Sequence, residues 1–201
     1  MIKLYGIPQS RALRSLWALE ELGVPYELVR TNFATDTRTP EYLKINPNGR
    51  IPALVDGPVT LFESMAINLY LAKKYDKAGL YPRDLDDEAR AVQWSIWGMT
   101  EIEPLLLQVL TNRVFLPPTQ RDESAARAAE ERLGPAFRVL DGALAGRKHL
   151  LGDAVTIADL NVASVAAWAL LGKLDLSKTP NAERWLRECA ARPAFAKAQK
   201  R

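Results

Sequence analysis

Cysteine and histidine are almost absent from this sequence. Cys189 and His149 are the single members of their kinds among 201 residues. One cysteine cannot form an internal disulfide, and one cysteine with one histidine cannot complete the four-ligand set of a structural zinc site. The sequence therefore excludes a disulfide-stapled fold and predicts no metal.

Long apolar runs and concentrated charge of one sign are missing too. No stretch approaches the ~20 apolar residues that span a bilayer, and the opening MIKLYGIPQS lacks the apolar centre of a secretory signal. The net charge is +3, with acidic residues interleaved among basic ones rather than a basic stripe. We therefore expect a cytoplasmic protein with no membrane and no nucleic-acid partner.

The chain does contain enough apolar material for a full core. Apolar residues make up 48% of the sequence and charged residues 25%, which is typical of a globular protein. At this length, one large domain or two small ones are expected.

The first 30 residues predict a β-α-β unit. Short strands are expected at 2–5 and 26–30, where β-branched, aromatic and leucine residues gather between turn signals. Between them, a helical stretch opens at Ser10 and is stopped by Gly23 and Pro25. Such a unit places its two strands side by side and parallel.

A β-β-α unit is expected after residues 31–50, which are predicted to form a loop with one helical turn near Glu41–Lys44. Strands 53–55 and 59–62 flank Asp56-Gly57-Pro58, a credible hairpin turn, and a helical period then runs over 64–75. The expected fold class is therefore an α/β N-terminal domain of order βαβ-ββα.

Strand signals disappear after residue 87, and only helical patterns follow. The expected helical stretches are 86–111, 121–145, 156–171, 180–191 and 193–200. Thr156 and Asp159 have the spacing of a capping box at the start of one of them. The predicted organisation is an α/β domain over 1–76, a linker over 77–87 and an all-helical domain over 88–201.

One dipeptide conflicts with its helical surroundings. Gly134-Pro135 falls inside the stretch 121–145, where proline loses a hydrogen bond and clashes with the carbonyl of Glu131, at ~3 kcal/mol. We expect a kink or a break between Arg132 and Ala136.

Four segments give the chain a specific family resemblance. They are LYGIPQSRALRSLWALEELGVPYE (4–27), NPNGRIPALVD (46–56), LFESMAINLYLAKKY (61–75) and LLGDAVTIADL (150–160). Together they resemble the glutathione S-transferase family over nearly the whole chain. The likeness is to serine-type members, including bacterial ones that resemble the theta and phi classes. The resemblance implies a thioredoxin-like first domain, and it implies glutathione as co-substrate.

Pro52 follows Ile51 at the position where the resembled family carries a cis proline. A proline cannot donate to a sheet ladder, so it is not expected inside a central strand. With the chain turned there, the backbone N–H and C=O of Ile51 would face a cleft, and an extended peptide such as glutathione could pair with both. The alternative is a structural cis proline that binds nothing.

Glu63 and Ser64 stand where the last helix of the first domain is expected to begin. Unpaired N–H groups and the helix dipole favour anions at such a place. The resemblance implies that Ser64 receives the α-carboxylate of the γ-glutamyl group and that Glu63 pairs with its ammonium. The alternative is a plain cap with a favourable charge beside it.

The resemblance assigns the catalytic role to Ser10, as a hydrogen-bond donor to the glutathione sulfur. A free thiol has a pKa of about 8.5, so a donor that stabilises the thiolate raises its population at neutral pH. Ser10 is not expected to be a nucleophile, because no histidine lies near it in sequence to act as base. A plain N-cap role for Ser10 and a donor role for Tyr5 remain the alternatives.

Basic residues between the two halves of the first domain are weaker candidates. By resemblance, Arg38 holds the glycyl carboxylate of glutathione, with Lys44 as the alternative. Arg50 lies beside Ile51, where family members often carry a polar side chain that touches glutathione. Each of these three could instead be a solvated surface charge.

A cleft between the two domains is expected to bind a small hydrophobic electrophile. The candidate residues for that pocket are Ile7, Pro8, Trp97 and Phe115. Cys189, His149 and Asp159 are expected to be structural.

The implied reaction is attack of the glutathione thiolate on the electrophile by a homodimer whose interface lies near 65–75. A glutathione-dependent peroxidase or disulfide reductase remains open, as does a non-catalytic glutathione-binding module.

Overall fold

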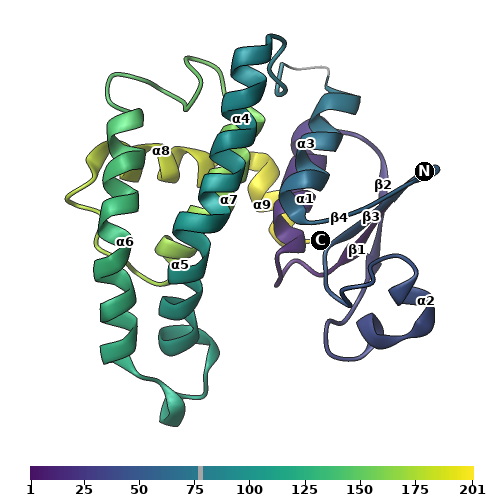
Figure 1. The fold of residues 1–201 in the computed structure, drawn as a ribbon, viewed down its shortest axis with the longest axis horizontal. Helices are drawn as coiled ribbons and strands as arrows, with labels where there is room; N and C mark the ends of the chain where they lie inside the picture. Colours follow the sequence, from purple (N-terminus) through teal and green to yellow (C-terminus); the bar gives the residue numbers. More distant parts are fainter. Residues whose placement is uncertain (77–78) are drawn as a thin grey trace. The chain divides into compact units, whose positions relative to one another are not determined.

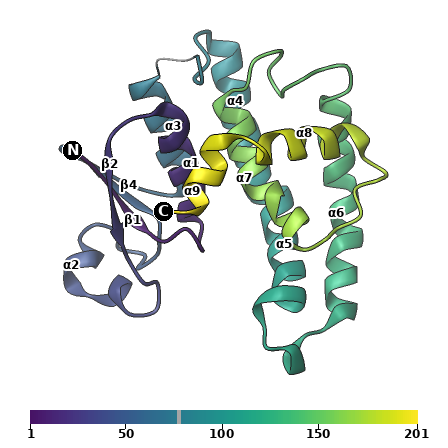
Figure 2. The same ribbon diagram turned by 180° about the vertical axis from the view of Figure 1, so that it is seen from behind.

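The chain forms two compact units in a computed structural model that describes residues 1–76 and 79–201. The first unit comprises Met1–Arg83 and Ala191–Arg201, and the second comprises Asp84–Ala190. The strands belong to the first unit, and helices build the second (Figures 1 and 2). The predicted fold class, an α/β domain followed by an all-helical one, is confirmed. Of the predicted linker 77–87, residues 77–78 lie outside the described residues.

The first unit is built on a four-stranded sheet of order β2-β1-β3-β4. Its strands are β1 (Ile2–Gly6), β2 (Tyr26–Arg30), β3 (Ala53–Asp56) and β4 (Val59–Phe62). β1 pairs with β2 in parallel and with β3 antiparallel, and β3 and β4 form an antiparallel hairpin. Gly57 supplies the positive φ, 59°, that the hairpin turn needs. The predicted strands and their βαβ-ββα order are confirmed.

Helices α1 (Ala12–Leu22) and α3 (Ser64–Tyr75) pack against each other beside this sheet (Figure 1). A short 3₁₀ turn (Asp36–Arg38) and α2 (Pro40–Leu43) lie within the loop of residues 31–50, and α2 confirms the helical turn predicted near Glu41–Lys44. Leu4, Leu16 and Leu54 are fully buried in the resulting core.

The last helix, α9 (Pro193–Gln199), packs on α1 within the first unit. The ring centroids of Trp17 and Phe195 lie 4.6 Å apart, and Arg192 forms an ion pair of 2.6 Å with Glu21. The division expected from sequence assigned all of 88–201 to the helical domain, whereas these contacts group Ala191–Arg201 with the first unit.

The second unit begins with one nearly continuous helical run. Its parts are α4 (Leu85–Trp97), a π-helical turn (Gly98–Ile102), α5 (Glu103–Leu110) and a second π-helical turn (Thr111–Phe115). Pro104 accounts for the first wide turn, because its ring would meet the carbonyl of Thr100 in a regular α-helix. The N–H of Glu103 bonds instead to the carbonyl of Gly98, five residues back.

Three further helices complete the second unit: α6 (Glu123–Ala143), α7 (Ile157–Leu171) and α8 (Pro180–Ala190). α7 is apolar and buried on almost every side, and it contacts α4, α5 and α8. A helix that is hydrophobic all round is a core helix, so α7 is the centre around which this unit packs.

Of the two alternatives predicted at Gly134-Pro135, a kink or a break, the break is wrong, and the kink stays a prediction. α6 continues through Pro135 from Glu123 to Ala143. Pro135 and Glu131 are both exposed, so water can satisfy the carbonyl that loses its partner. The buried residues of α6, among them Leu133 and Phe137, lie on its other face and hold the helix together across the proline.

The predicted capping box at the start of α7 is confirmed, and its carboxylate does more than cap. One oxygen of the fully buried Asp159 accepts from the N–H and hydroxyl of Thr156, at 2.9 and 3.1 Å. The other accepts from the Leu150 N–H and the Trp185 indole N–H, each at 2.9 Å. His149 Nδ1 lies 3.6 Å away. Asp159 therefore joins α7, α8 and the loop before α7.

Candidate functional site

The turn between β1 and α1, which carries Ser10, begins close to Ile51. Gly6 has a φ of +151°, and a Cβ placed there would lie 2.4 Å from the Ala12 side chain and 3.7 Å from that of Ile51. Only glycine allows this close approach. The turn that carries Ser10 and the segment that carries Ile51 are therefore neighbours.

The Ser10 hydroxyl is held in this turn by two hydrogen bonds. It donates to the Ile7 carbonyl at 2.7 Å and accepts from the Ala12 N–H at 3.1 Å. The Ser10 backbone N–H also donates to the Ile7 carbonyl, at 3.1 Å. Because that carbonyl keeps a second donor, the hydroxyl proton can turn toward a sulfur without leaving a backbone group unpaired.

The predicted start of the first helix at Ser10 is two residues early. Ser10 and Arg11 form a turn closed by a bond of 3.0 Å from the Leu13 N–H to the Ser10 carbonyl, and α1 begins at Ala12. Ser10 thus precedes the helix as a capping side chain, and its hydroxyl is half-buried rather than covered by the core.

The Ile51–Pro52 peptide bond is cis, as the resemblance implies. β3 begins only at Ala53, so Ile51 precedes the ladder. Within residues 1–76 and 79–201, neither the N–H nor the C=O of Ile51 has a backbone hydrogen-bond partner. An extended peptide could pair with both groups and add a short antiparallel strand.

Glu63 and Ser64 lie at the start of α3, as predicted. Glu63 is the N-cap residue, is exposed, and has φ 69° and ψ 114°. Such a backbone costs a residue with a Cβ on the order of 1–3 kcal/mol, and residues held in this way cluster at functional sites. Ser64 is the first residue of the helix and is 4% exposed.

A buried arginine adds positive charge to the same helix start. The side chain of Arg14 in α1 is only 2% exposed, and its Nη1 lies 3.5 Å from the Ser64 hydroxyl. The guanidinium and the amino end of α3 both favour an anion beside Ser64.

Replacing Glu63 with glycine is expected to move stability and glutathione affinity in opposite directions. Glycine relieves the backbone strain, so the free energy of unfolding should rise by about 1 kcal/mol. Loss of the carboxylate should weaken glutathione binding by about tenfold, the effect of one charge-assisted hydrogen bond. Chemical denaturation and titration calorimetry measure the two effects.

The matched variant Glu63→Gln keeps the strain and removes the charge. It should bind glutathione as weakly as the glycine variant while unfolding like the parent protein. Unchanged glutathione affinity in both variants would remove Glu63 from the site.

Arg38 is better placed than Lys44 beside the Ile51 segment. A Cβ on Gly49 would lie 2.7 Å from the Arg38 guanidinium, so that group rests against the backbone of the turn leading to Arg50. Gly49 has a φ of +58°, which also favours glycine. Lys44 ends α2 as an exposed C-cap.

The residues expected to contact the electrophile belong to different units. Ile7 and Pro8 lie in the first unit, where Pro8 is buried. In the second unit, Trp97 packs edge-on against Trp94 at 5.0 Å, and the exposed Phe115 faces Trp168 at 6.5 Å. The electrophile pocket stays a prediction.

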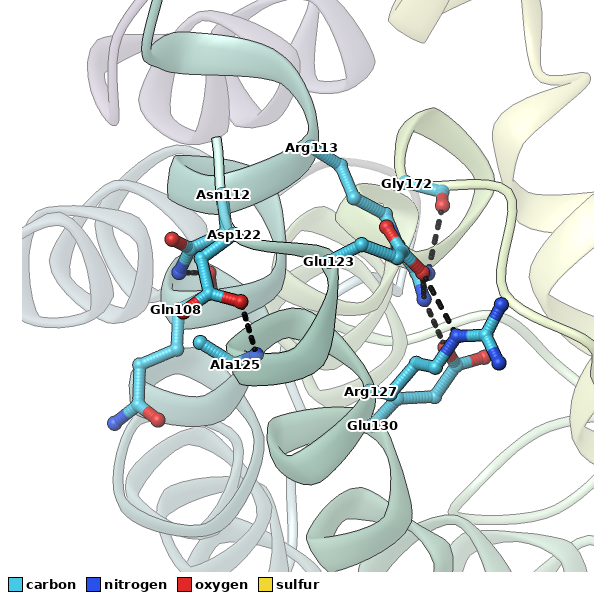
Figure 3. A network of polar contacts seen from close by, with 9 residues as sticks. All are labelled: Gln108, Asn112, Arg113, Asp122, Glu123, Ala125, Arg127, Glu130 and Gly172. Atoms are coloured by element: carbon cyan, nitrogen blue, oxygen red, sulfur yellow. Dashed lines mark hydrogen bonds and ion pairs between the residues drawn. The ribbon is translucent and has the colours of Figure 1, made fainter. Parts of the chain in front are cut away.

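The second unit holds a surface hollow of its own, with a volume of about 630 Å³. Its lining residues are Arg113, Val114, Glu123, Glu130, Leu171, Gly172, Lys173 and Asp175. Arg113 pairs with Glu123 at 2.8 Å and with Glu130 at 2.6 Å, and donates to the Gly172 carbonyl at 3.3 Å (Figure 3). Because these polar groups satisfy one another, we interpret the network as a tie between three segments.

Sequence reasoning missed Arg14 and the residues that support the Ile51 segment. Arg14 lies one turn before Trp17 on the buried face of α1, and an arginine on an apolar face is a signal that could have found it. Tyr42 and Asn46, whose side chains donate to the Arg50 carbonyl, gave no such signal.

Within 1–76 and 79–201, no helix is long and apolar enough to cross a bilayer. The same residues contain no group of three or more His, Cys, Asp or Glu side chains placed to hold a metal ion.

The sheet order, the cis bond and the helical second unit define the class of protein, and comparisons with known families agree. Residues 1–73 match the family described as Glutathione S-transferase, N-terminal domain, and residues 102–193 match Glutathione S-transferase, C-terminal domain. The chain belongs to the glutathione S-transferase family, and it is a glutathione transferase.

Individual relatives align with nearly the whole length of the chain. Glutathione S-transferase 3 of Zea mays is 34% identical, covering 98% of this chain and 92% of its own. Glutathione S-transferase GstB of Escherichia coli (strain K12) is 32% identical, covering 98% and 97%. The structure of a theta-class glutathione S-transferase from Xanthomonas axonopodis pv. citri, solved with glutathione bound, superimposes with a TM-score of 0.90 at 28% identity, covering 100% and 97%.

Proposed function

We propose that the first unit binds glutathione along Ile51 and that Ser10 activates its sulfur for attack on a small hydrophobic electrophile. In this arrangement the cysteinyl backbone pairs with the N–H and C=O of Ile51. The γ-glutamyl carboxylate lies at Ser64, with its ammonium beside Glu63. The observation that carries the proposal is the unpaired backbone of Ile51 next to the turn that presents Ser10.

The chemical step requires a glutathione thiolate and an electrophile held close to it. The thiol proton leaves to water, and the Ser10 hydroxyl donates a hydrogen bond to the sulfur that remains. A sulfur lone pair then forms a C–S bond while the electrophile releases its leaving group or accepts the electron pair of its double bond. Holding both reactants together lowers the entropic part of the barrier. Stabilising the thiolate anion provides the rest of the rate enhancement.

Titration calorimetry with glutathione tests the proposal and separates two candidate residues. The parent protein should take up glutathione, and Arg38→Ala should weaken that binding about tenfold through loss of a charge-assisted bond to the glycyl carboxylate. Lys44→Ala, also the loss of an exposed cation, should leave the affinity within about twofold. The reverse order would assign the carboxylate to Lys44, and no uptake by the parent protein at millimolar glutathione would refute the binding site.

We also propose a homodimer that acts in the cytoplasm. The exposed Phe62 at the end of β4, two residues before α3, supports an interface near 65–75. The cytosol maintains the reduced glutathione pool that the reaction consumes. Sedimentation equilibrium should report twice the chain mass of 22.4 kDa, and fractionation of cells should recover the protein with cytosolic markers. Its proposed role is the removal of reactive electrophiles.

A further inference from the structure

Two buried side chains donate hydrogen bonds to one backbone carbonyl, which directly precedes Ile51. The Tyr42 hydroxyl and the Asn46 side-chain amide each donate to the Arg50 carbonyl, both at 2.7 Å. Tyr42 is 5% exposed and Asn46 is 2% exposed. A surface loop carbonyl rarely receives two buried donors, because water can satisfy it without cost.

These two hydrogen bonds to the Arg50 carbonyl fix the direction of the Ile51 N–H. The Arg50 C=O and the Ile51 N–H belong to the same peptide unit. This peptide is trans, since Ile51–Pro52 is the cis bond found among residues 1–76 and 79–201. In a planar trans peptide the C=O and N–H point in opposite directions. With the carbonyl held toward Tyr42 and Asn46, the N–H is directed away from them.

We propose that Tyr42 and Asn46 are positioning residues that orient the Ile51 N–H for the cysteinyl carbonyl of glutathione. This inference rests on the proposed binding mode along Ile51. Without the two donors the peptide unit would sample other orientations, and glutathione would have to order it on binding. The two side chains therefore raise affinity by arranging the site before the ligand arrives.

Both donors are themselves held in place. The Tyr42 ring packs edge-on against Tyr5 of β1 at 6.0 Å, and burial, with the nearby Tyr5, raises the pKa of Tyr42 to about 12, so its hydroxyl keeps its proton. The Asn46 Oδ1 accepts from the Asn48 N–H at 3.0 Å while its Nδ2 serves Arg50. The two ends of this amide have different partners, so its orientation is determined.

The asparagine offers a nearly isosteric test. In Asn46→Asp, one oxygen still accepts from the Asn48 N–H, but the other places negative charge against the Arg50 carbonyl. The attraction that held the peptide becomes a repulsion, with little change in side-chain volume. We expect Asn46→Asp to weaken glutathione binding by about tenfold or more, on the order of a buried polar group that loses its partner.

Tyr42→Phe and Asn46→Ala each remove one of the two donors to the Arg50 carbonyl, so their effects should depend on each other. Each single variant leaves the other donor in place, so each should raise the dissociation constant of glutathione by only about threefold. The double variant releases the carbonyl and should exceed the product of the single effects, because residues that share one partner are not additive.

The experiment combines glutathione calorimetry, steady-state kinetics and thermal melts. In Asn46→Asp and in the double variant, KM for glutathione should rise with the dissociation constant. At saturating glutathione, kcat and the pKa of the bound thiol should match the parent, since Ser10 is untouched. Tyr26→Phe is the matched control: it also deletes a hydroxyl whose carboxylate acceptor, Glu20, keeps other donors. It should lower stability without changing KM.

Two results would overturn the inference while the parent still binds glutathione. The first is a dissociation constant within twofold of the parent in both Asn46→Asp and the double variant. The second is a rise in the dissociation constant of Tyr26→Phe that equals the rise in Asn46→Asp and the double variant, at the same loss of thermal stability. If the parent protein takes up no glutathione, the proposed function fails and this inference fails with it. Asn46→Asp keeps the test available if the double variant does not fold.

Discussion

Ser10→Ala is expected to raise the pKa of the glutathione thiol in the bound state by about 1–2 units, toward the value of about 8.5 for a free thiol. The alanine variant loses a hydrogen bond to an anion, which is worth roughly 1.5–3 kcal/mol. At pH 7, kcat/KM should therefore fall by about tenfold to hundredfold, since each unit of pKa costs a factor of ten in thiolate. Calorimetric affinity for glutathione should change little.

The pH dependence of the Ser10 effect is the informative measurement. Ultraviolet absorbance of the bound thiolate, followed from pH 5 to 10, gives its pKa directly in both proteins. The ratio of parent to variant kcat/KM should shrink as pH rises above 8, because both thiols then ionise. Ser10→Thr keeps a hydroxyl and should restore most of the activity.

A different result would favour a different role for Ser10. If the alanine variant shows the same thiol titration as the parent, Ser10 acts only as the capping side chain that accepts from the Ala12 N–H. The expected loss would then be limited to about 1 kcal/mol of stability. Under that outcome Tyr5, half-buried in β1 beside Tyr42, would become the candidate donor.

Local patterns predicted the elements of this fold because each depends on neighbours in sequence. Gly23 ends α1 with a φ of 62°, and Gly57 turns the β3–β4 hairpin. Helices such as α7 can be predicted from their capping residues and their apolar content. The order βαβ-ββα followed from these patterns, and connection rules then gave the parallel pairing of the βαβ unit and the antiparallel hairpin. Family resemblance was needed for the cis bond, since proline in sequence does not specify its isomer.

Specific side-chain contacts outside the regular elements were beyond the same reasoning. Nothing in the sequence near Arg50 shows that its carbonyl meets Tyr42 and Asn46, because ordinary tyrosines and asparagines occur in many loops. Likewise, the pairing of α9 with α1 depends on Phe195 reaching Trp17 across most of the chain. Periodicity identifies a buried face, but it does not identify which surface covers that face.

Pro135 shows how tertiary packing can override a local rule. The cost of a proline inside a helix is real, yet α6 buries Leu133 and Phe137 on either side of it. Burial of two such side chains contributes roughly 3–6 kcal/mol, which offsets the ~3 kcal/mol penalty. The break predicted from sequence counted the penalty and omitted this gain.

Asp159→Asn should be the most destabilising conservative change in the helical unit. Each carboxylate oxygen of Asp159 accepts two hydrogen bonds, and an asparagine offers only one such oxygen. Its amide nitrogen would face buried donors, from Thr156 on one side or from Leu150 and Trp185 on the other. With each unmatched buried donor costing about 1–3 kcal/mol, we expect a loss of about 3 kcal/mol or more.

The exposed Asp153 supplies the control for this change. Asp153→Asn makes the same chemical substitution a few residues earlier, on the surface, and should alter the free energy of unfolding by less than about 0.5 kcal/mol. Urea unfolding followed by circular dichroism compares the two variants with the parent. If the two asparagine variants unfold at the same urea concentration, the buried carboxylate does not hold this unit together.

Acid should narrow the difference between Asp159→Asn and the parent. Burial alone would raise the pKa of Asp159, but the nearby His149 and the N–H donors of Leu150, Thr156 and Trp185 outweigh it and hold the pKa below its ordinary value. A carboxyl with a depressed pKa stabilises the fold above the pKa of about 3.9 in the unfolded chain, and that stabilisation is lost as pH falls through its folded value. The parent should therefore lose stability below about pH 4 more steeply than Asp159→Asn, whose side chain does not titrate. Parallel losses would show that other carboxylates dominate the acid unfolding of this unit.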